Sequence, residues 1–263
     1  MNYKNICESV CEIARSTGLF IKEERQNAIL NIETKGSNDF VTHIDKASER
    51  RIVDGLKKLL PEAGFIAEEG TEDVRGDKFN WIIDPIDGTT NFIHGLSPYA
   101  VSIALMEDDK MVVGVVYEVG LDECFYSWKG GQAYLNGKVI EVSKAPTVAD
   151  SLVATGFPYS NFSRMDGFKE SLDYFMMNSH GLRRLGSAAT DLVYVACGRF
   201  ESFYEYDLKP WDVAAGAFIV EQAGGKVCDF SKGDNYIFGR EIIASNKATF
   251  DEFSNAIYKL MVK

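Results

Sequence analysis

The chain has 263 residues, of which 46% are hydrophobic, enough to bury one large core without disulfide or metal support. Its formal net charge of −11 provides no broad positive field, so we expect neither a nucleic acid nor a membrane surface as a direct partner. The first residues lack the continuous apolar core of a signal peptide and no later apolar run could span a bilayer, which predicts a cytoplasmic protein.

Two amphipathic helices open the chain. Apolar residues recur at helical spacing over residues 6–20 and again over residues 52–59, where Pro61 ends the second pattern. The polar segment between them, residues 33–49, reads as a loop that ends at a helix start, where Asp45 can cap free backbone amides. Five cysteines at irregular positions favour free thiols that pack in the interior, rather than disulfides or a metal site.

Short apolar runs then predict strands. Residues 65–67 and 81–83 have the composition of strands buried on both faces. From residue 99 to 142 the pattern predicts an antiparallel meander, in which Asn136-Gly137 is a strong signal for a tight hairpin. Strands and helices alternate afterwards, with strands expected at 151–157, 182–186, 201–206, 226–230 and 241–245, and helices at 164–176, 188–198, 212–225 and 250–260.

The change of pattern near Ala145-Pro146 indicates two lobes of one compact α/β (α+β) catalytic unit. The first, residues 1–145, is expected to be an α+β lobe with the antiparallel meander. The second, residues 146–263, is expected to be an α/β lobe.

The segment "WIIDPIDGTTNF" places two aspartates directly after an apolar strand. Pro85 should deny further ladder pairing, which would release Asp84 and Asp87 at the carboxyl end of the strand, where open α/β sheets bind ligands. Gly88 allows a close backbone approach. Thr89-Thr90 can cap a helix whose first amides suit a phosphate oxygen.

Two further acids stand at comparable boundaries. Glu68 follows the strand at residues 65–67, and Asp212 begins a glycine- and alanine-rich helix. Each acid alone is simply explained as a turn or helix-end residue. Together with Gly88 and Thr89 they indicate a two-metal site, because carboxylates and a phosphate repel one another unless hard cations such as Mg²⁺ lie between them.

The segments "DPIDGTTNF" and "PWDVAAGAFIVEQAGG" closely resemble the two signatures of the inositol monophosphatase family. The members of this family are Mg²⁺-dependent, lithium-sensitive phosphomonoesterases. The resemblance covers essentially the whole chain and includes "FIAEEG", "LRRLGSAATDL" and "IIASN". It implies a layered αβαβα sandwich of the sugar-phosphatase type, a homodimer, and two or three Mg²⁺ ions in each active site.

Carried over by position, the family's site residues all have counterparts in this sequence. The metal ligands would be Glu68, Asp84, the backbone carbonyl of Ile86, Asp87 and Asp212. Gly88 and Thr89 would bind phosphate through backbone amides. The Thr89 hydroxyl, oriented by Asp45, would act with Glu68 to activate a water for in-line attack on phosphorus.

The alcohol part of the substrate would meet a second set of residues. The resemblance implies contacts from Gly186, Ser187, Ala188 and Glu205. Three nearby cations could meet the substrate or a second phosphate, or could instead pair with surplus acids: Arg183, Arg184 and Lys209. The resemblance places Lys35 on a loop that closes over the metals, where it could also contact the substrate; the alternative is a solvated loop lysine. His43, His94 and His180 share no spacing with a catalytic partner and are expected to be surface or packing residues.

The resulting expectation is hydrolysis of a small phosphate monoester, inositol monophosphate first. NADP(H), fructose 1,6-bisphosphate and 3′-phosphoadenosine nucleotides remain alternatives on the same fold, and aromatic residues in the segment 155–165 could stack on a base. A regulatory protein that acts through a transcription or RNA-processing partner is an alternative of another class. A dinucleotide-dependent dehydrogenase is excluded, because no glycine-rich fingerprint follows a strand and opens a helix.

Overall fold

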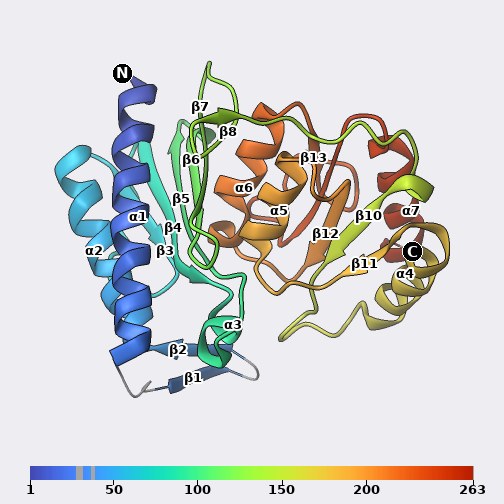
Figure 1. The fold of residues 1–263 in the computed structure, drawn as a ribbon, viewed down its shortest axis with the longest axis horizontal. Helices are drawn as coiled ribbons and strands as arrows, with labels where there is room; N and C mark the ends of the chain where they lie inside the picture. The colour runs from blue at the N-terminus through green and yellow to red at the C-terminus, as the bar shows by residue number, and fades with distance from the viewer. Residues whose placement is uncertain (28–31, 37–38, 263) are drawn as a thin grey trace.

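The computed structural model describes residues 1–27, 32–36 and 39–262, and it describes side chains for residues 1–26 and 42–262. Helices and sheets alternate in five layers across the molecule, which confirms the expected αβαβα arrangement (Figure 1). The helices that form the three helical layers are α1 (Tyr3–Asn27) with α2 (His43–Leu59), α5 (Ala188–Ala196) with α6 (Pro210–Gln222), and α4 (Met165–Asn178) with α7 (Phe250–Met261).

The first sheet lies between α1–α2 and α5–α6. Its order is β3-β4-β5-β6-β7-β8-β9; β3 pairs with β4 in parallel, and every later pair is antiparallel. Asn136 and Gly137, with φ of 48° and 81°, form the predicted tight turn between β8 and β9. The strands are β3 (Gly64–Ala67), β4 (Phe79–Asp87), β5 (Ala100–Glu107), β6 (Lys110–Glu118), β7 (Glu123–Trp128), β8 (Tyr134–Leu135) and β9 (Lys138–Val139).

The second sheet lies between α5–α6 and α4–α7. Its order is β11-β10-β12-β14-β13, with β10 parallel to both of its neighbours and β14 antiparallel to β12 and β13. A short 3₁₀ turn, Val148–Asp150, precedes it. The strands are β10 (Leu152–Thr155), β11 (Gly181–Arg183), β12 (Ser202–Tyr206), β13 (Lys226–Cys228) and β14 (Glu241–Ser245).

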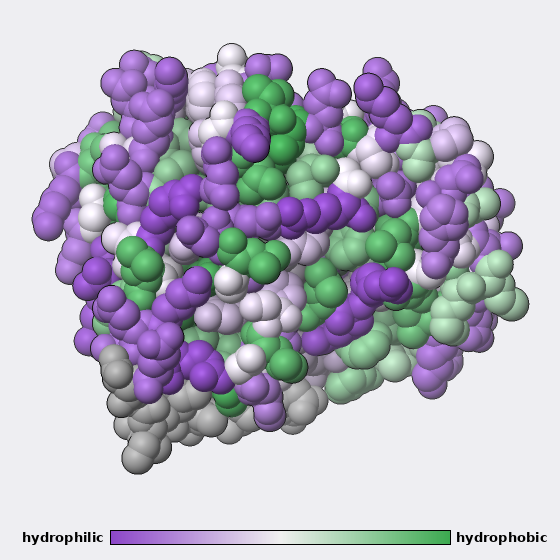
Figure 2. All heavy atoms as spheres, in the orientation of Figure 1, coloured by the Kyte–Doolittle hydropathy of each residue, from purple (hydrophilic) through white to green (hydrophobic). Residues whose placement is uncertain are grey.

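Three hydrophobic cores fill the spaces between layers. Trp81 belongs to the core beneath α1 and α2, Phe203 to the central one, and Phe253 to the one beneath α4 and α7. β4 is buried along its whole length because helices cover both faces of its sheet, which explains its nearly continuous apolar run. On the face seen in Figure 2, hydrophobic side chains form small separate groups among hydrophilic ones.

The predicted end of β4 at Ile83 is wrong. The strand continues to Asp87, pairing Asp84 with Ser102 and Asp87 with Ala100, and its register shifts between these two pairs. Pro85 lies within this irregularity, where its missing N–H takes no hydrogen bond away from the ladder. The shift separates the two aspartates by one extra residue and so sets how both carboxylates face the cavity.

The predicted loop at residues 33–49 is also wrong. β1 (Ile32–Gly36) and β2 (Asp39–Thr42) pair antiparallel there, and α2 follows at once. Backbone groups pair in a hairpin regardless of side-chain polarity, so a polar composition did not exclude strands. Thr42 rather than Asp45 is the N-cap of α2; Asp45, three residues later, completes a capping box with it.

Further expectations agree with the structure. All five cysteines are free, and Cys7, Cys124 and Cys228 are buried. Within the described part of the chain, no helix is long and apolar enough to cross a membrane.

Candidate active site

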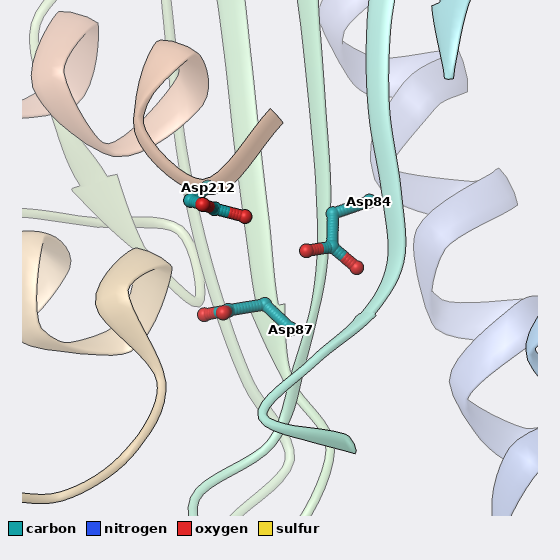
Figure 3. A group of neighbouring side chains, drawn as sticks. All are labelled: Asp84, Asp87 and Asp212. Atoms are coloured by element: carbon teal, nitrogen blue, oxygen red, sulfur yellow. The ribbon is translucent and has the colours of Figure 1, made fainter. Parts of the chain in front are cut away.

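Three aspartates from two distant segments converge at one end of the first sheet. β4 carries Asp84 and Asp87, and the first turn of α6 carries Asp212, with the three side chains directed at a shared space (Figure 3). One carboxylate oxygen of each lies within 4.8 Å of the others. Asp84 is only 2% exposed and Asp87 only 8%. Such a cluster has too little water around it to remain triply charged without compensation.

Each ionised acid of this cluster disfavours ionisation of the others. Burial, followed by the charges of Glu68, Asp87 and Asp212, raises the pKa of Asp84 well above its ordinary value. Burial likewise raises the pKa of Asp212, and the charge of Asp87 adds to it. A bound divalent cation would reverse this effect by favouring the ionised carboxylates. Because all donors are carboxylate oxygens, the residues present fit a hard ion such as Mg²⁺.

The second half of the chain holds Asp87 in position. Its Oδ2 accepts hydrogen bonds from the Ser187 hydroxyl (2.5 Å) and from the backbone N–H of Ala189 (2.8 Å), at the start of α5. Burial raises the pKa of Asp87 to about 6, and these hydrogen bonds limit the rise. The expected substrate contact Ser187 is 1% exposed, with its hydroxyl directed to Asp87.

Asp212 is held within its own helix. Its carboxylate accepts the backbone N–H of Lys209 at 2.7 Å, three residues before it at the start of α6. The Ser102 hydroxyl on β5 donates to the Trp211 carbonyl at 3.0 Å. This contact ties the start of α6 to the sheet that carries the other two aspartates.

Thr89 begins the short helix α3 (Thr89–His94). The N-cap of this helix is Gly88, which has no side chain to cap it, so the predicted capping by Thr89 and Thr90 is wrong. Gly88 has a φ of +91°, a left-handed conformation that disfavours other residues. The Thr89 hydroxyl lies 3.0 Å from the Ile86 carbonyl and 3.3 Å from Oδ1 of Asp45. Asp45 is fully buried behind Thr89, and its Oδ2 accepts from the Thr42 backbone and hydroxyl.

A cavity of about 300 Å³ collects most of the predicted residues. This volume is at the lower end for small-molecule sites, which suits a compact substrate. Predicted residues that line it are Glu68, Asp84, Ile86, Asp87, Gly88, Thr89, Arg184, Gly186, Ser187, Ala188, Glu205, Lys209 and Asp212.

Some predicted residues lie elsewhere. Arg183 is exposed and its guanidinium donates to the Leu182 carbonyl, outside the cavity lining. Lys35 falls outside the residues whose side chains are described. His43, His94 and His180 are exposed and do not line the cavity, as expected for surface residues.

Glu205 is a further buried acid that lines this cavity. It is 7% exposed, and burial raises the pKa of its carboxyl to about 8. Gly156 faces this carboxylate so closely that an added Cβ would lie 2.0 Å from its atoms. The glycine therefore provides the space in which Glu205 sits.

An arginine and two aromatic rings form the outer rim. The Arg184 guanidinium donates to the Tyr159 hydroxyl at 2.8 Å and lies 5.3 Å from the centre of the Phe157 ring. Phe157 and Tyr159 also line the cavity. Arg240, which the sequence did not single out, pairs with Asp207 at the same rim.

Asn91 is a buried residue that supports the site without lining the cavity, and sequence reasoning missed it. Its amide donates at 2.8 Å to the carbonyls of Pro98 and Leu185, joining α3 to the segment before α5. Its position within "DPIDGTTNF" was the available signal.

Comparisons with known proteins agree with this geometry. A sequence model of the inositol monophosphatase family matches residues 2–261. The Nus factor SuhB of Escherichia coli is 41% identical over 235 residues, covering 89% of this chain and 88% of its own. An inositol-1-monophosphatase of Mesorhizobium japonicum is 36% identical over 231 residues, covering 88% of this chain and 87% of its own. The crystal structure of the extragenic suppressor protein SuhB of Bartonella henselae superposes with a TM-score of 0.91 at 36% identity, covering 97% of this chain and 99% of the other.

Proposed function

Because this chain belongs to the inositol monophosphatase family, we propose that it is a Mg²⁺-dependent phosphatase that hydrolyses inositol monophosphate. The observation that carries the proposal is the convergence of Asp84, Asp87 and Asp212 beside Thr89 in one small cavity. A phosphate monoester and these carboxylates are all anionic, so the site suits this substrate only when cations are bound as well.

Two or three Mg²⁺ ions would be held by carboxylate and carbonyl oxygens. The residues that would hold them are Glu68, Asp84, the carbonyl of Ile86, Asp87 and Asp212. When bound, the ions neutralise the phosphate, favour ionisation of a water and stabilise the leaving alkoxide.

The chain's own residues would orient the substrate and move the proton. Thr89 accepts a hydrogen bond from the attacking water while its hydroxyl hydrogen is directed to the Ile86 carbonyl or Asp45, and the Glu68 carboxylate takes the water proton. The water oxygen then forms a bond to phosphorus as the ester bond breaks in line. The backbone amides of Gly88 and Thr89 bind the phosphate oxygens.

Glu205 would recognise hydroxyls of the alcohol. Its buried carboxyl lines the same cavity as the aspartates, together with Gly186, Ser187 and Ala188. A ribose or sugar diol offers the same hydrogen bonds, so NADP(H), fructose 1,6-bisphosphate and 3′-phosphoadenosine 5′-phosphate are competing substrates. Arg184 and Lys209 could meet a second phosphate, and Phe157 or Tyr159 could stack on a base.

The test is phosphate release from inositol 1-phosphate and the three competitors, with and without Mg²⁺. Turnover that needs Mg²⁺, is greatest on inositol 1-phosphate and is lost in Asp87→Asn supports the proposal. A different ranking with the same metal dependence would reassign the substrate, and no turnover on any of the four would refute the phosphatase assignment for these substrates. Lithium at millimolar concentration should inhibit the reaction.

A second candidate role is regulation through a transcription-related protein partner, because relatives about as similar as the phosphatase carry the name Nus factor SuhB. Cosedimentation with purified bacterial RNA polymerase, using both the wild type and the Asp87→Asn variant, tests this role apart from catalysis. We further propose a cytoplasmic homodimer that does not contact nucleic acid directly. Analytical ultracentrifugation, alone and with duplex DNA or RNA, tests the dimer and the absence of nucleic-acid binding.

A further inference from the structure

A buried carboxylate on α2 holds the loop that follows Glu68. Glu49 is fully buried and accepts three hydrogen bonds from this loop. Its Oε2 accepts the backbone N–H of Glu69 at 2.7 Å. Its Oε1 accepts the backbone N–H of Thr71 at 2.8 Å and the Thr71 hydroxyl at 2.7 Å. Within the described residues, Glu49 is stabilised by these hydrogen-bond donors and by no ion pair.

The contact acts on the backbone of Glu68 itself. The N–H that Glu49 binds belongs to the peptide group that joins Glu68 to Glu69. On the other side, the N–H of Glu68 donates to the Ile83 carbonyl on β4 at 3.2 Å. Both peptide groups that flank the Cα of Glu68 are therefore fixed, one by the sheet and one by α2.

We propose that Glu49 is a positioning residue that holds Glu68 in its metal-binding orientation, although it contacts neither the ion nor the substrate. The inference rests on the proposed function, because it takes Glu68 as a ligand. The same helix carries Asp45 one turn earlier, against Thr89. α2 thus orients two separate parts of the site through two buried carboxylates.

The first variant is Glu49→Gln. The amide has nearly the same shape but presents an N–H group to one of the loop donors, so the anchor is broken on one side. Mn²⁺ binding, followed without substrate by the electron paramagnetic resonance signal of the free ion, should weaken about 10- to 100-fold. The thermal midpoint without metal separates this effect from a general loss of folding.

A second pair keeps the proposal testable if Glu49→Gln does not fold. Thr71→Val removes one of the three donors, and Thr71→Ser retains it, so only the valine variant should weaken Mn²⁺ binding, by about fivefold. The matched control is Ser48→Ala. Ser48 lies next to Glu49 on α2 and is equally buried, but its hydroxyl has no hydrogen-bond partner among the residues that the structure describes. It should bind Mn²⁺ like the wild type.

Wild-type Mn²⁺ affinity in folded Glu49→Gln, or in Thr71→Val if Glu49→Gln fails to fold, would overturn the inference. Equal weakening in Thr71→Val and Thr71→Ser would overturn it too, because the hydroxyl would then not matter. Asp87→Asn distinguishes a failure of the proposed metal site from a failure of the positioning role of Glu49. If that variant binds Mn²⁺ like the wild type, the proposed metal site fails; if it loses binding while Glu49→Gln and Thr71→Val retain it, only the positioning role fails.

Discussion

Replacing Asp87 with asparagine should abolish activity and at the same time stabilise the metal-free protein. The side chain keeps its shape, and both hydrogen bonds from Ser187 and Ala189 go to the same oxygen, which the amide oxygen can replace. The variant therefore loses a charge and a metal ligand but neither of these hydrogen bonds.

The pKa of Asp87 sets the magnitude. Burial raises this pKa from its ordinary 3.8 to about 6, so ionising the folded form above pH 6 costs about 3 kcal/mol. The folded state holds the proton more tightly than the unfolded state, so this contribution to stability is complete below pH 4 and is lost as the pH rises to 6. Asparagine is neutral throughout, and the advantage of the variant should therefore grow over that interval.

Thermal melts in a chelator at pH 4 and pH 8 measure this difference. At pH 8 the variant should melt roughly 5–10 °C above the wild type, and near pH 4 the two should coincide. Added Mg²⁺ should raise the midpoint of the wild type much more than that of the variant. Asp87→Ala is the control: it removes the same charge but leaves two donors unpaired, so it should be less stable than Asp87→Asn. A metal-free Asp87→Asn protein that melts below the wild type at pH 8 would show that the charge of Asp87 does not destabilise the metal-free fold.

Three other substitutions probe the site and the core. Thr89→Ala removes the hydroxyl near Ile86 and Asp45. In steady-state kinetics, kcat should fall about 100-fold or more with little change in KM, and an unchanged kcat would exclude a role of this hydroxyl in orienting the attacking water. Gly156→Ala places a Cβ 2.0 Å from the Glu205 carboxylate and should raise KM for inositol 1-phosphate about tenfold but not for phenyl phosphate. Phe253→Ala empties a fully buried position and should cost about 3–5 kcal/mol in urea unfolding; a loss below 1 kcal/mol would contradict the packing seen here.

The local sequence was sufficient to predict those elements that depend on interactions between residues near one another in the chain. Hydrophobic periodicity placed the helices, apolar runs placed the strands of both sheets, and Asn136-Gly137 placed a turn, because each depends on residues a few positions apart. The types of candidate ligand were also visible, since closely spaced acids at strand and helix ends have few purely structural uses in combination. The resemblance to a family then supplied the layered arrangement, which periodicity alone does not determine.

Two features of the fold depend instead on how strands pair: the end of β4 and the hairpin before α2. Pro85 reads locally as the end of a strand, yet the register against β5 carries β4 through it to Asp87. The polar segment before α2 forms a hairpin because backbone pairing is indifferent to its side chains.

The same holds for the site. Nothing near Ser187 in the chain indicates that its hydroxyl is directed to Asp87, nor anything near Glu49 that it binds the loop after Glu68. Local sequence patterns account for most of the helices and strands and for the chemical groups that are present. Their distances and orientations arise only when segments far apart in the chain pack together, because those contacts satisfy buried charges that no local pattern records.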